Sequence, residues 1–296
     1  MGWATLDQLA ETLSRLYSVL DIAGHPPSLL LIPLQCTMRA ESSQWRIRRT
    51  HESTLAAHAI PFAPRIKRKF PSAHSGIYAI KDPCSGDNPF SYTKLVAVYC
   101  DMETEGGGWI VIQRRNASMG WVNFARGWVD YKNGFGDLDG EFWIGLQQIY
   151  ELTNQQMFEL NVRVMDDYNS DNNYWDYPYF RILNEKSRYA LFKTNNYYDW
   201  ADSIFGPYEG DNNYYFTTFD RYYGNNCGYT RQSGWWYYYS ENCDVNANLN
   251  GRHQPSGLSG IDGVGERLVW RYGSYADYST ATYSDMIIRP QSCELY

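Results

Sequence analysis

Signatures of metal binding and of catalysis are scarce in this sequence of 296 residues. The cysteines show no CxxC spacing and no two histidines stand close together, so the ligand spacing of a zinc site is missing. A serine elbow, an HExxH motif and a phosphate-binding P-loop are also missing. After residue 73 the only histidines are His74 and His253. The sequence therefore predicts a protein that is not an enzyme.

Long hydrophobic runs are missing as well. No stretch approaches the ~18 apolar residues that a membrane span requires. Residues 1–30 hold no basic segment followed by a clean apolar core, and the apolar run at 27–34 is short and broken by proline, so no clear signal peptide is visible. Membrane insertion is therefore not expected.

Clustered basic residues are missing from most of the chain. Residues 1–73 hold nine basic and five acidic residues, whereas the remainder holds 17 basic and 28 acidic ones. Nucleic acid binding needs Lys and Arg gathered against phosphates. The acidic body therefore predicts that nucleic acid is not a partner.

Aromatic residues, in contrast, are abundant, with 27 Tyr and 11 Trp. They are densest between Asp220 and Gly251, where Cys227 and Cys243 bracket a run that begins Trp235-Trp236. A disulfide between these cysteines closes a loop of about 15 residues and is worth roughly 3 kcal/mol. Two interpretations are open: rings that present a binding face, or a disulfide-stapled core strand.

The chain divides into two regions that differ in composition and hydrophobic pattern. Leucines recur at helical spacing over 5–20, which predicts an amphipathic helix, and 21–73 has the composition of a linker or disordered segment. From residue 74 to 296 we expect one folded domain. Between about 195 and 265 regular patterns vanish and Asn, Asp, Gly, Tyr and Trp predominate, which is typical of a loop-built binding region.

Short strands dominate the folded region. The expected strands are 76–80, 95–100, 109–115, 158–167, 189–194, 268–270 and 286–290, with the last two closing the sheet, and helical spacing covers Phe142–Leu152. Strands with a few short helices predict an α+β class with a mainly antiparallel sheet. Gly106–Gly108 permit unusual backbone angles where a strand must start.

Several segments, in this order, resemble the fibrinogen C-terminal domain family, over roughly 74–292. They are VYCDMETEGGGWIVIQRR (98–115), GFGDLDGEFWIGL (134–146), FTTFD (216–220), the GWW-containing loop from Cys227 to Cys243, ANLNG (247–251) and MIIRP (286–290). The resemblance implies a central twisted antiparallel sheet with short helices and a loop-rich binding subdomain. It also implies a secreted, non-enzymatic binding protein of the kind that includes ficolins, tachylectin-like lectins, tenascins and angiopoietins.

The resemblance places the ligand pocket beside the second disulfide. The candidate ligand-binding residues there are Tyr229, Arg231, Trp236, Cys243, Asp244 and Asn246. Lectin members of the family carry Cys-His where this chain has Cys243-Asp244, and their aromatic-Ala pair falls at Val264-Gly265. The expected function is lectin-like recognition of a glycan or acetyl group, of the innate-immune type, around Cys227–Gly251. The alternative is a matrix or signalling module that binds an extracellular protein through a retuned, non-acetyl pocket.

The resemblance also bears on calcium. Family members carry a D-x-D-x-D run after the F-[ST]-T motif, and its second and third aspartates bind calcium. Here Asp220 matches the first aspartate, and the position of the second is Tyr222. Calcium prefers 6–8 oxygen ligands that include carboxylates. The sequence thus offers only a weak calcium candidate, Asp220, and no certain cofactor.

Six cysteines in a family of extracellular proteins indicate disulfides and an oxidising compartment. The resemblance pairs Cys227 with Cys243, and Cys84 is the favoured partner of Cys100. Cys36 and Cys293 are left free, paired together or intermolecular, and the oligomeric state stays open. The sequon at Asn116 predicts N-glycosylation of a secreted chain.

Overall fold

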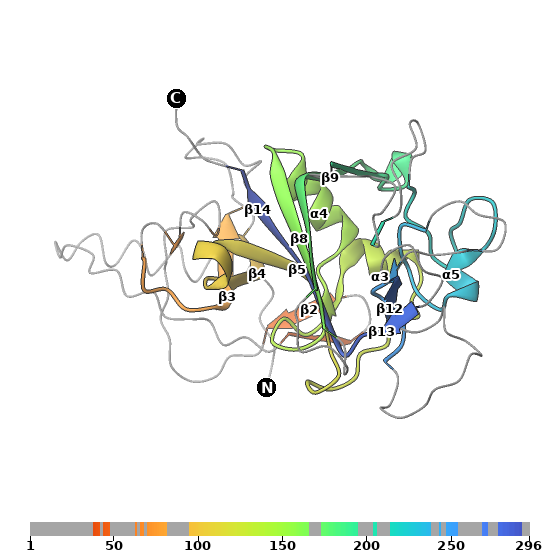
Figure 1. Ribbon diagram of the computed structural model, residues 1–296, viewed down its shortest axis with the longest axis horizontal. Coiled ribbons are helices and arrows are strands. Elements are labelled where there is room, and N and C mark those ends of the chain that lie inside the picture. The colour runs from red at the N-terminus through yellow and green to blue at the C-terminus, as the bar shows by residue number, and fades with distance from the viewer. Residues whose placement is uncertain are drawn as a thin grey trace.

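The computed structural model describes residues 38–41, 44–47, 63, 66–67, 70–81, 95–165, 173–194, 204–205, 214–237, 243, 247–253, 268–271 and 278–291 (Figure 1). Their strands are β1 (Met38–Glu41), β2 (Gln44–Ile47), β3 (Gly76–Lys81), β4 (Leu95–Asp101), β5 (Trp109–Asn116), β6 (Phe135–Gly136), β7 (Phe142–Trp143), β8 (Phe158–Met165), β9 (Asn173–Ile182), β10 (Leu191–Thr194), β11 (Ala247–Asn248), β12 (Val269–Arg271), β13 (Tyr278–Thr280) and β14 (Tyr283–Pro290). The helices are α3 (Trp128–Asn133), α4 (Leu146–Thr153) and α5 (Cys227–Thr230), with 3₁₀ turns η2 (Thr104–Gly106) and η3 (Glu185–Ser187).

The central sheet runs in the order β10-β9-β8-β14-β5-β4-β3, with the short β7 and β6 beside β5. Every pair in it is antiparallel. In Figure 1, β3 and β4 lie on one side of the molecule, and α3, α5, β12 and β13 lie on the other. The predicted class, α+β with an antiparallel sheet, is confirmed.

The MIIRP segment does not close the sheet, as the sequence led us to expect. It belongs to β14, which lies between β8 and β5 and pairs with both along its length. Its residues 284–288 are buried, because neighbouring strands cover both edges and packed layers cover both faces. The LVW segment is also placed elsewhere, since β12 joins β11 and β13 in a separate three-stranded sheet.

A tight glycine turn starts the buried strand β5. Gly106, Gly107 and Gly108 have φ values of +85°, +79° and +86°, a region that favours glycine. A Cβ on Gly107 would lie 2.2 Å from the carbonyl oxygen of Met102, so no side chain fits there. The prediction that these glycines serve the backbone is confirmed.

The helix expected over Phe142–Leu152 begins four residues later. Phe142 and Trp143 instead form β7, paired with Arg114 and Gln113 of β5. Gly145, at φ +110°, then turns the chain into α4, whose buried face includes Leu146, Ile149 and Leu152. Phe142 and Trp143 are fully buried, as the sequence predicted.

An aromatic core joins the sheet to the loop-rich side. The ring of Trp143 lies 5.6 Å from that of Tyr131 in α3, 5.7 Å from that of Phe216 and 5.9 Å from that of Trp236. These are favourable separations for tilted and edge-on ring pairs. The loop-rich region is therefore built directly on the sheet core.

The N-terminal region differs from its prediction in two places. Residues 38–41 and 44–47, expected to be linker or disordered, form the β1–β2 hairpin. Ala63 and Ile66 are buried in the core, although they precede the predicted domain start at residue 74. The helix predicted over 5–20 lies outside the described residues. Within the described part of the chain, no helix is long and apolar enough to cross a membrane.

Candidate functional site

A disulfide anchors the segment in which the sequence concentrates aromatic residues. Cys227 opens α5 and is bonded to Cys243, with 5.2 Å between their Cα atoms, so the predicted pair is confirmed. Asn226 caps α5, since its Oδ1 accepts from the Tyr229 N–H at 3.0 Å. The Nδ2 of Asn226 donates to the Phe219 carbonyl at 2.9 Å, which ties the helix to the preceding loop.

Close backbone contacts hold this segment against the core. Thr217 and Trp235 exchange two backbone hydrogen bonds, at 3.0 and 3.1 Å. A Cβ on Gly228 would lie 2.3 Å from the carbonyl carbon of Thr218, and one on Gly234 would lie 2.6 Å from the ring of Tyr131. The GWW motif therefore needs its glycine so that the two tryptophans can follow into the core.

Trp236 was predicted to contact ligand, and this prediction is wrong. Its side chain is 1% exposed and packs 5.0 Å, centroid to centroid, from Phe216. Its indole Nε1 donates to the Tyr189 carbonyl at 2.8 Å, so even the polar edge is used internally. Trp235 and Tyr237 are buried too. Over residues 235–237 the rings belong to the disulfide-stapled core, although the segment forms only an isolated bridge, from Trp235 to Thr217, and not a full strand.

Arg231 and Cys243 lie together, and the contact between them links two loop segments. The guanidinium of Arg231 donates to the Cys243 carbonyl through Nε at 2.8 Å and Nη2 at 2.6 Å. Cys243 itself is buried and has a φ of +54°. The backbone carbonyl of Arg231 accepts from Asn248 at 3.2 Å. Asp244 and Asn246, the other predicted ligand-binding residues here, lie outside the described residues.

Exposed aromatic side chains do gather on this segment, at positions that the sequence analysis mostly missed. We call them the exposed aromatic surface; they are Phe219, Tyr222, Tyr223 and Tyr229, and each is between 45% and 66% exposed. Only Tyr229 was predicted. Aromatic spacing alone does not separate buried from exposed rings in an irregular segment, because there is no strand or helix period to assign them to a face.

Asp220, the weak calcium candidate, has a structural role. Its Oδ1 accepts from the Trp128 N–H at 2.9 Å and from the Thr218 hydroxyl at 2.7 Å, so it caps the start of α3. Gly127 leaves room for this approach, since a Cβ there would lie 2.5 Å from the carboxylate. Because the Asp220 carboxylate already accepts these two hydrogen bonds, it is poorly placed to bind a cation. The described residues also hold no cluster of three His, Cys, Asp or Glu suited to a metal.

We expect the Asp220→Ala substitution to lower the free energy of unfolding by about 1 kcal/mol, because α3 loses its cap. The Asp220→Asn variant keeps an acceptor oxygen and should lose less. Urea denaturation, with calcium and then with a chelator, measures both effects. A loss that appears only with calcium present would instead identify Asp220 as a calcium ligand.

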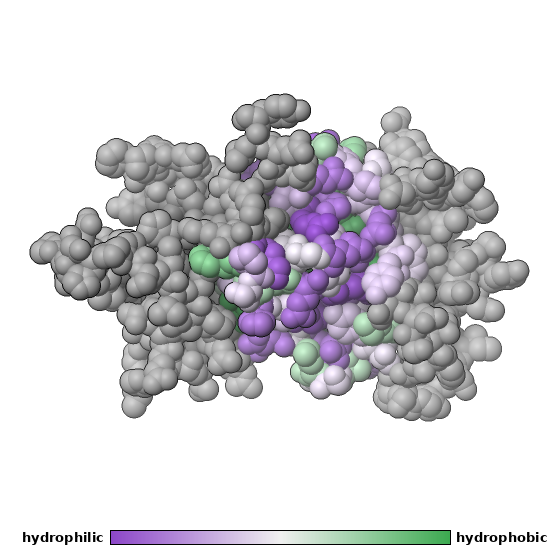
Figure 2. Space-filling model, turned by 60° about the vertical axis from the view of Figure 1, so that its left-hand side comes forward, coloured by the Kyte–Doolittle hydropathy of each residue, from purple (hydrophilic) through white to green (hydrophobic). Residues whose placement is uncertain are grey.

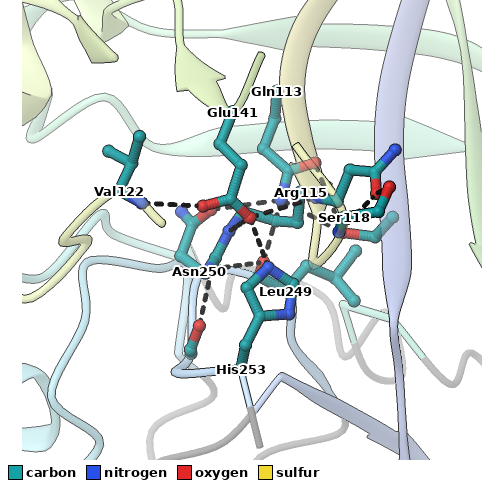
Figure 3. Close-up of polar contacts among 11 residues, drawn as sticks. Gln113, Arg115, Ser118, Val122, Glu141, Leu249, Asn250 and His253 are labelled. Carbon is teal, nitrogen blue, oxygen red and sulfur yellow. Dashed lines mark hydrogen bonds and ion pairs between the residues drawn. The ribbon is translucent and has the colours of Figure 1, made fainter. Parts of the chain in front are cut away.

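A buried polar network links strand β5 of the central sheet to the loop-rich side (Figure 3). Glu141 accepts from Arg115 Nε at 3.2 Å, from the Val122 N–H at 2.9 Å and contacts His253 Nε2 through Oε1. Arg115 also donates to the Gly251 carbonyl at 2.5 Å. Burial raises the pKa of Glu141, but the hydrogen bond from His253 and the charge of Arg115 outweigh it and hold that pKa below its usual value.

The same network explains the ANLNG motif. Gln113 Nε2 donates to the Leu249 carbonyl at 2.8 Å, and Asn250 Nδ2 donates to the Gly234 carbonyl at 2.9 Å (Figure 3). Asn248 and Asn250 are fully buried, where unpaired amides are costly. These asparagines therefore fix the loop backbone, and the motif specifies the fold.

The remaining predicted sites have mixed outcomes. Cys100 is a buried free cysteine, so the favoured Cys84–Cys100 pair is wrong. The hairpin register gives the reason: Cys100 pairs with Gly76, at the end of the hairpin opposite to the connection that carries Cys84. Asn116 ends β5 and its Oδ1 accepts from the Ser118 hydroxyl at 2.7 Å, on an exposed turn. Glycosylation at Asn116 stays a prediction.

Residues 72–291 match the family model of the C-terminal globular domain of fibrinogen beta and gamma chains. The chain therefore belongs to the fibrinogen C-terminal domain family, which its motifs predicted. Members of this family are recognition modules that bind ligands or extracellular proteins and are not enzymes.

Individual relatives include angiopoietin-related and lectin-like proteins. Angiopoietin-related protein 2 of Homo sapiens is 39% identical over 166 residues, which are 55% of this chain and 31% of that protein. Techylectin-5A of Tachypleus tridentatus is 38% identical over 198 residues, which are 65% of this chain and 63% of that protein. The chain thus spans less than two thirds of each. The fibrinogen-like globe domain of human ANGPTL6 superposes with a TM-score of 0.62 at 29% identity, covering 81% of this chain and 100% of that domain.

Proposed function

We propose that this chain is a secreted, non-enzymatic recognition module that binds a glycan or an acetylated group through its exposed aromatic surface. The observation that carries the proposal is the contrast along one disulfide-anchored segment. Trp235 and Trp236 complete the core, whereas Tyr222, Tyr223 and Tyr229 stand in solvent. Water-facing rings have no role in packing the core, and they suit contact with the apolar face of a sugar.

Rigidity of the segment supports the same proposal. The Cys227–Cys243 disulfide, the Asn226 cap and the paired Thr217–Trp235 backbone hold the rings on a fixed frame. A tyrosine on a fixed backbone loses little conformational freedom on binding, because it has only two side-chain torsions. On the face shown in Figure 2, the described surface is largely hydrophilic, with small, separate apolar groups, so the described residues form no broad hydrophobic interface on that face.

The test is retention of the full chain on immobilised N-acetylglucosamine, with free acetylated sugar as competitor. We expect Tyr229→Ala to weaken binding about tenfold, which corresponds to about 1.4 kcal/mol. Trp121→Ala is the matched control, because Trp121 is an aromatic residue with the same exposure, 67% against 66%, on a different loop. Equal losses in both variants would contradict the proposed surface, and no retention of the wild type would contradict recognition of an acetylated sugar.

A second candidate, binding to an extracellular protein, is favoured by the composition of the same surface. Tyrosine and arginine are enriched among the residues that contribute most to protein interfaces. Arg188 lies over the exposed ring of Tyr223, and Arg221 directly precedes Tyr222 in the chain. Failure of the sugar column, together with capture of an extracellular receptor that Tyr229→Ala weakens, would select this candidate.

A further inference from the structure

A cleft beside the exposed aromatic surface carries a different chemistry. It lies between the η3–β10 connection and the segment 214–224, with a volume of about 400 Å³. Its lining includes Lys186, Ser187, Arg188, Leu183, Tyr215 and Tyr223. We propose that this basic cleft is a subsite for a sugar that bears an anionic group, a carboxylate or a sulfate. The proposal deepens the proposed function and rests on it, because Tyr223 belongs to both surfaces.

The backbone presents Arg188 to the cleft in an unusual conformation. Arg188 and Tyr189 have φ values of +51° and +47°, two successive left-handed residues that are not glycine. Such strain persists only where the surroundings impose it, and it concentrates at functional sites. Here the Phe216 N–H donates to the Arg188 carbonyl at 3.0 Å, and Leu191 forms a bridge with Tyr214. The cleft wall is therefore held in one shape.

The guanidinium of Arg188 is oriented but not neutralised. Its Nη1 donates to the Tyr222 carbonyl at 3.0 Å, and its central carbon lies 5.4 Å from the centre of the Tyr223 ring. An arginine has five N–H donors in a fixed fork, so this bond leaves others available. Lys186 is exposed on the same wall. Two cations thus face one cavity in a chain whose formal charge is −7.

The carboxylate of Glu185, which precedes Lys186 in the chain, is already paired with residues outside the cleft lining. Glu185 accepts from Lys132 Nζ at 2.6 Å, from Trp128 Nε1 at 2.8 Å and from Arg221 Nη1 at 3.0 Å. The hydrogen bonds from Lys132 and Trp128 lower the pKa of Glu185 to about 2, so Glu185 is ionised at neutral pH and is paired with Lys132 and Arg221. Across the described residues, no carboxylate forms an ion pair with Lys186 or Arg188. Among the described residues, the cleft therefore holds two cationic side chains and no carboxylate paired with either of them.

The other walls fit a saccharide better than an inorganic anion. Tyr215 and Tyr223 meet edge to face, with 5.8 Å between ring centres and 65° between planes. This corner offers flat apolar faces to the C–H groups of a pyranose ring, and Ser187, which lines the cleft, supplies a hydroxyl that can bond a sugar hydroxyl. The volume is that of a small-ligand site. A ring, hydroxyls and one anionic group together match an acidic sugar.

The experiment is an NMR titration of the full chain with small sugars that carry no acetyl group. The probes are methyl β-glucuronide for the carboxylate and galactose 6-sulfate for the sulfate, with methyl β-glucoside and galactose as neutral partners. We expect at least one acidic sugar to bind, its neutral partner to bind much more weakly, and added salt to weaken the acidic complex. Lys186→Gln and Arg188→Gln should each raise Kd roughly three- to fivefold, the size expected of a partly exposed ion pair.

Matched variants separate the cleft from its surroundings. Lys186 is exposed, so Lys186→Gln leaves the fold intact, and Arg252→Gln removes one exposed charge elsewhere as the control. Tyr223→Ala should weaken the acidic sugar, whereas Trp121→Ala should not. Binding of one probe and not the other identifies the anion and supports the subsite.

Three results would overturn the subsite. The first is that neither acidic sugar binds; if N-acetylglucosamine is still retained, the proposed function then survives without it. The second is binding that Lys186→Gln and Arg188→Gln leave unchanged. The third is an acidic peptide that binds in place of the sugars with the same dependence on Lys186. Binding of an acidic sugar without retention of acetylated sugar would support the subsite and refute acetyl recognition.

Discussion

Replacing Trp236 with alanine is expected to lower the free energy of unfolding by about 3–5 kcal/mol, the usual cost of removing a buried tryptophan. The indole packs against Trp143 and Phe216 and is 1% exposed. Its loss leaves a cavity at the junction of sheet and loops, and the Tyr189 carbonyl loses its donor. This loss is a large fraction of the whole free energy of unfolding of an ordinary domain.

Urea denaturation followed by far-ultraviolet circular dichroism measures this effect. Tyr229→Ala is the control within the same disulfide loop, and it should change the unfolding free energy by less than about 0.5 kcal/mol because Tyr229 is exposed. The two variants should have distinct effects: Trp236→Ala lowers the free energy of unfolding, and Tyr229→Ala weakens ligand binding. A stable Trp236→Ala protein that fails to bind sugar would restore Trp236 as a ligand contact.

Removing the carboxylate of Glu141 is expected to be equally severe. Glu141→Ala leaves the buried guanidinium of Arg115 without its counter-charge, and breaking such a pair costs about 3–5 kcal/mol. The Asn116 and Val122 N–H groups lose their acceptor at the same time. Glu103→Ala, at an exposed position, is the control and should be nearly neutral.

The pH dependence of stability gives an independent check on Glu141. Its pKa in the folded state lies below the ordinary value of 4.5, so its contribution is complete above pH 4.5 and is lost as the pH falls through the lower folded pKa. The stability difference between wild type and Glu141→Gln should therefore shrink on acidification below pH 4.5. A difference that stays constant from pH 7 to pH 3, measured by denaturant unfolding, would show that folding does not lower the pKa of Glu141.

Sequence patterns predicted the elements whose burial is regular. The alternation of β8 and the continuous apolar run of β5 gave their strands, and the glycines before β5 gave its start. β9 was missed because its sequence, NYWDYPYFRI, includes a proline and an aspartate and lacks a clean alternation. The position of β14 was missed because strand order depends on contacts between distant segments, which local patterns do not encode.

The candidate site was less predictable than the fold. Motif matching identified the Cys227–Cys243 disulfide, but it assigned Trp236 to ligand and left out Tyr222 and Tyr223. Lys186 and Arg188 were also overlooked, because they lie more than 30 residues before Tyr223 in the chain and only the fold brings them together. Three-dimensional neighbours, rather than residue types, decide which rings and charges face solvent.

The central position of β14 has a consequence for how this domain is made. The ribosome releases β5 and β8 long before β14, so each strand has one unpaired edge that waits for residues 283–290. Until then the nascent sheet exposes two strand edges with unpaired backbone groups and an uncovered core, a state that is prone to aggregate. A stop codon or frameshift anywhere before residue 283 would remove the middle of the sheet rather than its margin. The central sheet can therefore be completed only after residues 283–290 have been synthesised.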